Sequence, residues 1–114
     1  NPVSCAASLG VFEALESSPE LMTGIPAKEK FIRDVLVHPS IEKISGKGLM
    51  YCLWLKPEVD SFAVIARLEA EGLITNSFLF AENAICITPP LTITTKELDK
   101  GLKLILRVIE EFSA

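Results

Sequence analysis

Three kinds of side chain in this sequence are the first candidates for covalent or acid–base chemistry: one histidine, three cysteines and eight lysines. The histidine, His38, precedes Pro39 at the end of a predicted helix, and the local spacing suggests no Ser-His-Asp set. We therefore expect His38 to be a surface residue near a helix C-terminus, with a general-base role as the less favoured alternative. No catalytic residue is predicted.

Covalent attachment of a carbonyl cofactor needs a lysine whose pKa is lowered in a partly desolvated site. The lysines of this chain fall in loops, beside a predicted strand or on helix surfaces, at positions 28, 30, 43, 47, 56, 96, 100 and 103. We expect none of them to hold a cofactor. Gly46-Lys47-Gly48 resembles part of a phosphate loop but lacks the full spacing and the following helix, so a turn is predicted there.

The cysteines Cys5, Cys52 and Cys86 are odd in number and far apart. This spacing argues against a disulfide framework and against a metal site, and it fits a reducing, cytoplasmic setting best. Cys86 lies in the middle of a predicted strand, on the face opposite to Ile85 and Ile87. The favoured interpretation of Cys86 from this pattern is a small, buried or half-buried apolar residue.

The periodicity of apolar residues predicts an α+β domain, with a small and mostly antiparallel sheet of about three strands covered by about four helices. The predicted helices span about 2–17, 26–37, 61–71 and from 95 onward. The predicted strands span about 49–56, 73–75 and 84–88, with a turn at 45–48 and a loop at 76–83.

Helix caps support these boundaries. Asn1 with Pro2 is typical of a helix start, Asp60 or Ser61 can cap the third helix, and Thr94 with Glu97 forms a capping box. A sequence that opens on a helix cap rather than on Met suggests a segment of a longer protein. The apolar loop tip 78–80 either folds onto the core or contacts a missing partner.

Composition excludes several classes of function. The chain has 114 residues, which suits one domain, and 49% of them are apolar. A net charge of −4 without a basic patch argues against nucleic-acid binding. No apolar run approaches the roughly 18 residues that a membrane span needs, so no membrane partner is predicted.

Four segments, in order, resemble the class III pyridoxal-phosphate aminotransferases. Asn1-Pro2-Val3-Ser4-Cys5-Ala6-Ala7 is similar to the family's Asn-Pro-Leu-Ala-Cys-Ala-Ala, and Gly46-Lys47-Gly48-Leu49-Met50 to its Gly-Lys-Gly-Leu-Met. Glu71-Gly72-Leu73-Ile74 resembles Glu-Lys-Gly-Leu-Leu. The segment from Thr88-Pro89-Pro90 to Thr94 is the closest match.

This resemblance implies that residues 1–114 are the C-terminal small domain of a fold type I enzyme, a homodimer or larger. Residues 1–17 would then be the helix that connects it to the missing large domain. The lysine that holds pyridoxal 5'-phosphate and the aspartate that pairs with its ring nitrogen would lie upstream. The fragment alone would be inactive and would bind no cofactor, while the parent would transfer an amino group between an amine or amino acid and a keto acid.

The chain departs from the family pattern at one position in the last strand. The family motif Asn-x-Ile-Arg-x-x-Pro-Pro places an arginine that commonly grips a substrate carboxylate, whereas Asn83-Ala84-Ile85-Cys86 places a cysteine there. A cysteine cannot make a bidentate charged contact with a carboxylate. The resemblance therefore implies that Cys86 lines the substrate site but lacks the usual anchor, so amine, ketone or polyamine substrates become more plausible.

Two other hypotheses stay open at this point. The parent could be a mutase, racemase or decarboxylase on the same scaffold, because the cofactor supplies the difficult chemistry. Alternatively, the chain could be a free-standing α+β module that binds a small molecule or a protein.

Overall fold

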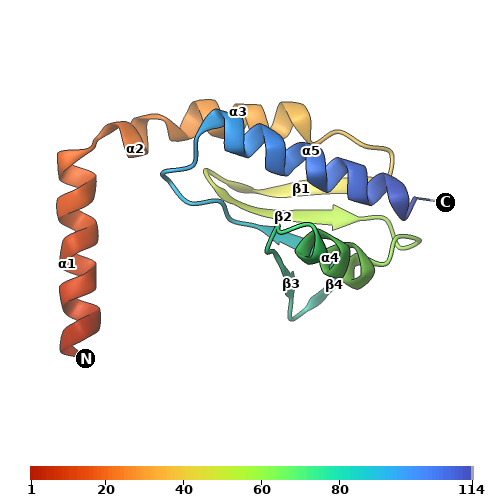
Figure 1. Cartoon of the computed structure of the whole chain (residues 1–114), viewed down its shortest axis with the longest axis horizontal. Helices are drawn as coiled ribbons and strands as arrows, with labels where there is room; N and C mark the ends of the chain where they lie inside the picture. The colour runs from red at the N-terminus through yellow and green to blue at the C-terminus, as the bar shows by residue number, and fades with distance from the viewer. Residues whose placement is uncertain (114) are drawn as a thin grey trace.

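The computed structural model describes residues 1–113 as helices packed on one antiparallel sheet (Figure 1). The elements follow the order α1 (Pro2–Ser17), α2 (Glu20–Thr23), α3 (Ile25–Val35), β1 (Ile41–Lys47), β2 (Met50–Leu55), α4 (Ser61–Ala70), β3 (Asn76–Phe78), β4 (Ala81–Ile87) and α5 (Thr95–Glu111). The predicted α+β class is confirmed. Over these residues the sheet has four strands rather than about three, and a short helix, α2, was not predicted.

The strand order in the sheet is β1-β2-β4-β3, and every neighbouring pair is antiparallel. Two hairpins, β1–β2 and β3–β4, are joined by the pairing of β2 with β4. Helix α4 connects these hairpins along the chain and packs against β3, β4 and α5. The two central strands of the sheet, β2 and β4, are therefore distant from each other in sequence.

The core lies on one face of the sheet. Tyr51, Leu53 and Leu55 of β2 and Ile85 and Ile87 of β4 all point to this face, and each is at most 8% exposed. The alternation predicted for the last strand is confirmed. The helices complete the core with the buried residues Ile32, Leu36, Val64, Leu68, Leu98, Leu102, Ile105, Val108 and Ile109.

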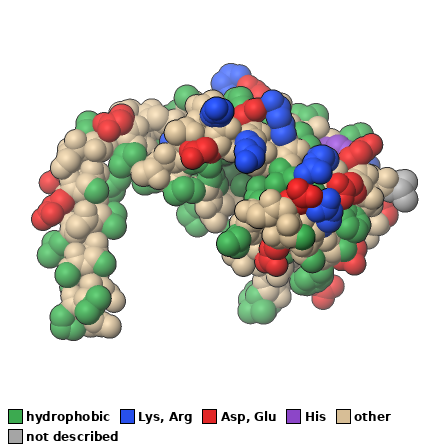
Figure 2. Space-filling view, viewed as in Figure 1, with side chains coloured by type: hydrophobic (Ala, Val, Ile, Leu, Met, Phe, Trp, Pro, Cys, Tyr) green, Lys and Arg blue, Asp and Glu red, His purple; other side chains and the backbone are tan. Residues whose placement is uncertain are grey.

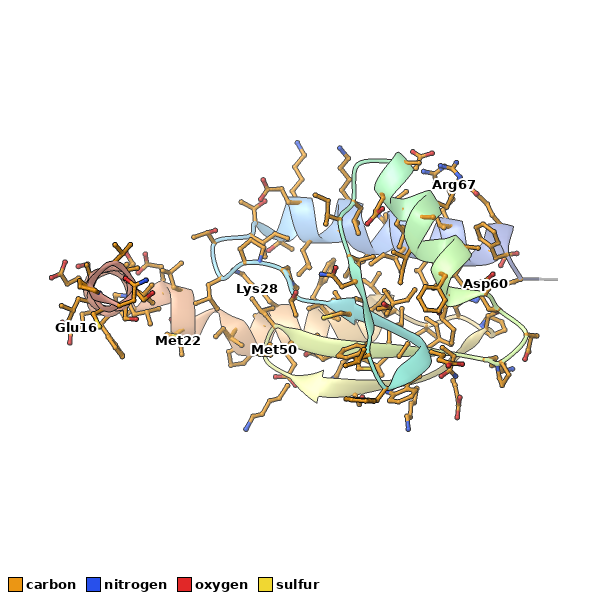
Figure 3. All side chains as sticks on the ribbon, turned by 90° about the horizontal axis from the view of Figure 1, so that it is seen from below. Glu16, Met22, Lys28, Met50, Asp60 and Arg67 are labelled. Carbon is orange, nitrogen blue, oxygen red and sulfur yellow. The ribbon has the colours of Figure 1, made fainter. Side chains whose placement is uncertain are left out.

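The other face of the sheet has no helix packed on it within residues 1–113 (Figure 3). Lys43 and Ser45 are exposed there, while Cys52, Trp54 and Cys86 are half-buried. We call this surface the open face. Within it, the Lys43 ammonium lies 4.4 Å from the centre of the Trp54 ring, and the Trp54 indole donates to Ser45 Oγ at 2.9 Å.

The predicted caps are confirmed. Asn1 Oδ1 accepts from Val3 N at 3.0 Å, and Asp60 Oδ1 accepts from the first amides of α4. At α5, Thr94 Oγ1 accepts from Glu97 N at 3.2 Å and Glu97 Oε2 accepts from Thr94 N at 2.9 Å. Hydrogen bonds from the Thr94 hydroxyl and amide lower the pKa of Glu97, so the capping box holds this carboxylate ionised.

Helix α1 has the predicted bounds but contributes no buried residue. It projects from the body of the molecule, at the left of Figure 1. Its apolar side chains Val3, Leu9, Val11 and Phe12 are between 58% and 76% exposed. Figure 2 shows apolar side chains along this helix, and none of its residues is buried by another described element.

Three sequence-based boundaries were wrong in the sheet. The predicted turn at 45–48 is largely strand, because β1 runs through Ser45, Gly46 and Lys47 and the chain reverses only at Gly48 and Leu49. Gly46 has φ of 135° and lies against Tyr51, so it marks an irregular strand backbone rather than a turn.

The other two errors concern the β3–β4 hairpin. The predicted strand at 73–75 is irregular, and the predicted loop at 76–83 contains β3 and the start of β4. Its turn consists of Leu79 and Phe80, which are 86% and 95% exposed. This turn lacks the glycine or asparagine that usually signals a hairpin, and the apolar run 78–80 obscures the alternation of both strands.

Replacement of Gly46 by Ala should destabilise the chain by about 2 kcal/mol or more, because of steric overlap and backbone strain. A Cβ atom at this position would lie 2.1 Å from Met50 O and 2.9 Å from Tyr51 Cα. The matched control is Gly101→Ala in α5, where the new Cβ would meet only Leu73 Cδ1 at 3.5 Å. Urea unfolding should show the control to be neutral or stabilising, by up to about 1 kcal/mol. Equal midpoints for the two variants would contradict the assignment of Gly46 to the strand.

Candidate functional site

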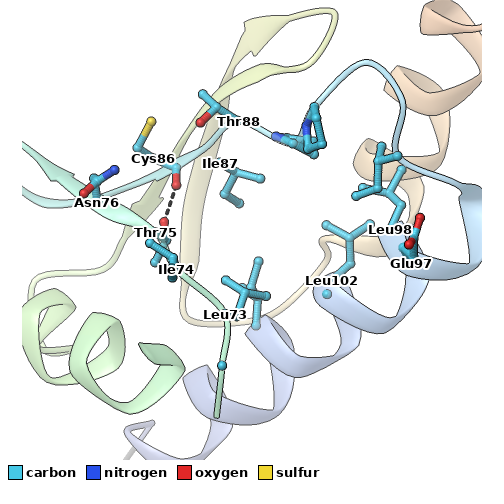
Figure 4. A pocket seen from close by; sticks show the side chains of 16 residues that line it. Leu73, Ile74, Thr75, Asn76, Cys86, Ile87, Thr88, Glu97, Leu98 and Leu102 are labelled. Atoms are coloured by element: carbon cyan, nitrogen blue, oxygen red, sulfur yellow. Dashed lines mark hydrogen bonds between the residues drawn. The ribbon is translucent and has the colours of Figure 1, made fainter. Parts of the chain in front are cut away.

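The candidate site is built around the C-terminal half of β4, where Cys86 stands between two different surfaces. Its thiol lies on the open face, because Cys86 alternates with the core residues Ile85 and Ile87. Its backbone borders a cavity of about 310 Å³ on the helix side of the sheet. Figure 4 shows the sulfur atom pointing away from the side chains of Ile87 and Leu102.

Two side chains fix the backbone of this strand. The Thr75 hydroxyl, which is only 6% exposed, donates to the carbonyl oxygen of Cys86 (Figure 4). The Asn83 amide donates to Leu55 O at 2.8 Å and ties β4 to the end of β2. Buried carbonyl groups need such partners, so Thr75 and Asn83 are positioning residues for position 86.

The segment after β4 is also anchored. Lys28 Nζ of α3 donates to Leu91 O at 2.6 Å, and Ile93 N donates to Pro90 O at 3.0 Å. Proline at 89 and 90 cannot continue the sheet ladder, so the chain leaves β4 and turns into α5. Lys28 therefore links α3 to the segment between β4 and α5.

The cavity is mainly apolar. It lies between residues 72–76, the end of β4 and the first half of α5, and Leu73, Ile87, Leu98 and Leu102 face it. Thr75 and Glu97 are polar residues on its border, but Glu97 is already held in the capping box. The cavity therefore offers shape and apolar contact rather than an acid–base pair.

His38 connects two elements at the far end of the domain. Its Nδ1 accepts from Ser40 N at 3.1 Å, so Nε2 carries the proton that bonds Glu110 Oε2 at 2.6 Å. The side chain is 12% exposed, which makes it more buried than the predicted surface residue. Both ring nitrogens are engaged within the domain, and His38 lies away from Cys86.

Gly46-Lys47-Gly48 forms the end of β1 and the following turn, and no helix follows it. Gly46 O accepts from Arg33 at 2.7 Å, and Gly48 N donates to Glu29 Oε2 at 3.1 Å. The Gly48 amide, which a phosphate loop would offer to a phosphate oxygen, is therefore already hydrogen-bonded to the Glu29 carboxylate. The Arg33 guanidinium also lies 5.2 Å from the centre of the Tyr51 ring, which fixes β2 to α3.

None of the eight lysines in the chain fits a site for a covalently attached cofactor. None has a buried side chain: Lys28 is half-buried and bonded to Leu91, and the others are exposed. Lys30 and Lys103 pair with Asp34 and Asp99 on helix surfaces. Within residues 1–113, no three His, Cys, Asp or Glu side chains gather as a metal site would require, and no helix has the length and apolar character to cross a membrane.

The strand neighbours of Cys86 could not be recognised from sequence spacing. The register pairs Cys86 directly with Cys52 on β2 and with Asn76 on β3. Residues 52 and 86 are separated by α4 and the β3 strand, so only the strand pairing brings them together. The available signal was that each cysteine alternates with buried residues in an apolar strand.

The sequence matches the family model described as aminotransferase class-III over residues 1–109. It is 32% identical over 116 aligned residues to the acetylornithine aminotransferase of Caldanaerobacter subterraneus subsp. tengcongensis, an alignment that covers 97% of this chain and 28% of that protein. It is 29% identical to an ornithine aminotransferase of Bacillus cereus, covering 96% of this chain and 27% of the relative. The chain thus spans little more than a quarter of these curated relatives.

Solved structures show the same fold. An ornithine aminotransferase from Toxoplasma gondii ME49 superposes with a TM-score of 0.82 at 22% identity, covering 97% of this chain and 27% of that one. The adenosylmethionine-8-amino-7-oxononanoate aminotransferase of Methanocaldococcus jannaschii gives a TM-score of 0.79 at 22% identity, with 97% and 28% covered. The matched part therefore includes the projecting helix as well as the sheet.

Replacement of Thr75 by Val should cost about 1–3 kcal/mol of unfolding free energy, because it removes the hydrogen bond from this buried hydroxyl to the Cys86 carbonyl. The control is Thr88→Val, the same chemical change at an exposed side chain on the border of the same cavity. It should change stability by no more than about 0.5 kcal/mol. Denaturant unfolding of both variants measures the difference, and a neutral Thr75→Val would show that Thr75 does not support this strand.

Proposed function

This chain belongs to the class III aminotransferase family, and on that premise we propose that it is the C-terminal small domain of a pyridoxal-phosphate-dependent aminotransferase. The parent enzyme transfers an amino group between an amine or amino acid and a keto acid. The observation that carries the proposal is the family match across 1–109 in a chain that spans only 28% of a relative's length.

The missing partner in this proposal is the large domain of the same polypeptide. Two surfaces support it. One is formed by the apolar side chains of α1, where residues 1–17 are the connection, and the other is the β3–β4 turn with Leu79 and Phe80, below the sheet in Figure 1. Exposed apolar groups of this kind are typical of surfaces that pack on another domain or subunit. The homodimer is proposed for the parent on the same grounds.

Pyridoxal 5'-phosphate belongs, in this proposal, to the parent rather than to residues 1–114. The cofactor supplies the electron sink for chemistry at the amine-bearing carbon. The described lysines do not fit its covalent attachment, because none lies in the desolvated setting that lowers a lysine pKa. The described residues instead fit a supporting role, in which they shape one wall of the substrate site.

We place that wall at Cys86 and the adjoining open face. The Cys86 side chain is half-buried and forms no contact with a charged side chain among residues 1–113, while Thr75 and Asn83 hold its backbone in place. With cysteine at this position, β4 supplies no guanidinium for a substrate carboxylate. A cytoplasmic location fits the three free cysteines of the chain.

The proposed function is tested by comparing the 114-residue chain with the natural polypeptide that contains it. The natural polypeptide should show amino transfer with pyridoxal phosphate, assayed with ornithine, N-acetylornithine and simple diamines as donors. The 114-residue chain should show none, and reduction with borohydride should leave no cofactor attached to any of its lysines. Stoichiometric attachment to one of these lysines would contradict the small-domain assignment.

Replacement of Cys86 by Arg in the natural polypeptide should raise kcat/KM for carboxylate-bearing donors relative to donors without a carboxylate. A charged hydrogen bond is worth about 1.5–3 kcal/mol, which corresponds to a selectivity gain of about 10- to 100-fold. Cys5→Arg, the same change on exposed α1, is the control and should leave the selectivity unaltered. If Cys86→Arg leaves the ratio unchanged while activity persists, position 86 does not line the substrate site.

A further inference from the structure

Cys52 and Cys86 oppose each other across the two central strands of the sheet. They are direct register partners in the antiparallel pairing of β2 with β4, and the neighbouring pairs on both sides continue without a bulge. Both side chains are therefore on the same face, and both are half-buried on the open face. Neither thiol is bonded to another cysteine in this structure.

The backbone at this pair has the separation that a disulfide requires. Directly opposed residues of antiparallel strands have Cα atoms about 4.5–5.5 Å apart, whichever type of pair they form. Disulfides are found at Cα separations of about 4.4–6.8 Å. A bond between the two sulfur atoms therefore needs side-chain rotation, without a shift of either strand.

The surroundings of the pair influence its reactivity. Ser45 of β1 is the register partner of Cys52 on its other side, and Lys43 lies on the same face. Burial raises the pKa of the Cys52 thiol and so does the neighbouring Cys86, while Ser45 and Lys43 act in the opposite direction. Burial therefore disfavours the Cys52 thiolate as the first nucleophile, and we assign the first attack to Cys86.

We propose that Cys52 and Cys86 are a reversible disulfide-forming pair, oxidised by small-molecule disulfides such as oxidised glutathione. The Cys86 thiolate attacks one sulfur of the oxidant and releases one glutathione thiolate. The Cys52 thiolate then attacks the Cys86 sulfur of the mixed disulfide and releases the second. Two protein thiols lose two protons and two electrons, and one glutathione disulfide gains them to become two glutathione thiols.

The fold makes the second step favourable. Once Cys86 carries glutathione, Cys52 is held beside it by the strand pairing, so the closing reaction is intramolecular. Cys5 provides a contrast, because it lies exposed on α1 without a cysteine register partner. The resulting bond would join the two halves of the sheet, and this inference does not depend on the proposed enzymatic activity.

The test is a peptide-linkage experiment on the folded natural polypeptide that contains this sequence. It is treated with oxidised glutathione, its free thiols are blocked with N-ethylmaleimide, and it is digested with trypsin without reduction. Cleavage after Arg67 places Cys52 and Cys86 in separate tryptic peptides, 48–67 and 68–96, and the bond after Lys56 is resistant because Pro57 follows it. Mass spectrometry should find these two peptides linked, and dithiothreitol should separate them.

Matched variants identify the bond. Cys52→Ser and Cys86→Ser should each abolish the linkage, with Cys52→Ser trapping glutathione on Cys86, whereas Cys5→Ser should leave it intact. Linkage should be at least about tenfold greater in the folded protein than in urea at the same oxidant ratio, since the fold supplies the high effective concentration. The proposal is overturned if folded wild-type protein carries glutathione on both cysteines without linkage, or if linkage forms only in urea.

Discussion

The pairing of β2 with β4 is the interaction on which the rest of the domain depends. It joins two hairpins that are otherwise separate, and it places Leu53 beside Ile85 and Tyr51 beside Ile87 at the centre of the core. These strands are separated in sequence by α4, so the pairing forms only when the helix crosses back over the sheet. Loss of this register by one residue would turn every core side chain of the strand to the open face.

That same alternation explains why the domain has two unlike faces. On the helix side, α3, α4 and α5 bury Tyr51, Leu53 and Leu55 of β2 with Ile85 and Ile87 of β4 in a continuous core. On the open side, the intervening residues are polar, aromatic or small, and no helix in residues 1–113 packs on them. The asymmetry extends to α1, whose apolar side chains find no partner in the described part of the chain. The domain therefore combines a continuous core on one side of the sheet with exposed apolar side chains on α1.

The sequence predicted those features that depend on local signals. The capped starts of α1, α4 and α5 were predicted because side-chain oxygens and backbone amides a few residues apart determine them. The β3–β4 hairpin was missed because its turn residues, Leu79 and Phe80, carry no turn chemistry. Likewise, Gly46 has a positive φ inside a strand, which the sequence cannot distinguish from a turn glycine. The opposition of Cys52 and Cys86 required the register itself, which depends on tertiary packing rather than on local pattern.

The charge distribution on the open face bears on what position 86 can recognise. The positive side chains on this face come from β1, where Lys43 and Lys47 alternate with Ser45. Because β1 is two strands away from β4, the backbone of these lysines lies about 10 Å from that of position 86, given a strand spacing of about 4.8 Å. That separation is close to the screening length of about 8 Å at physiological ionic strength, so a lysine that stays over β1 would attract a carboxylate beside Cys86 only weakly. The Lys43 ammonium is engaged by the Trp54 ring on the intervening strand β2. In the substrate site proposed for Cys86, recognition would therefore rest on shape and apolar contact, or on a charge contributed from outside residues 1–113.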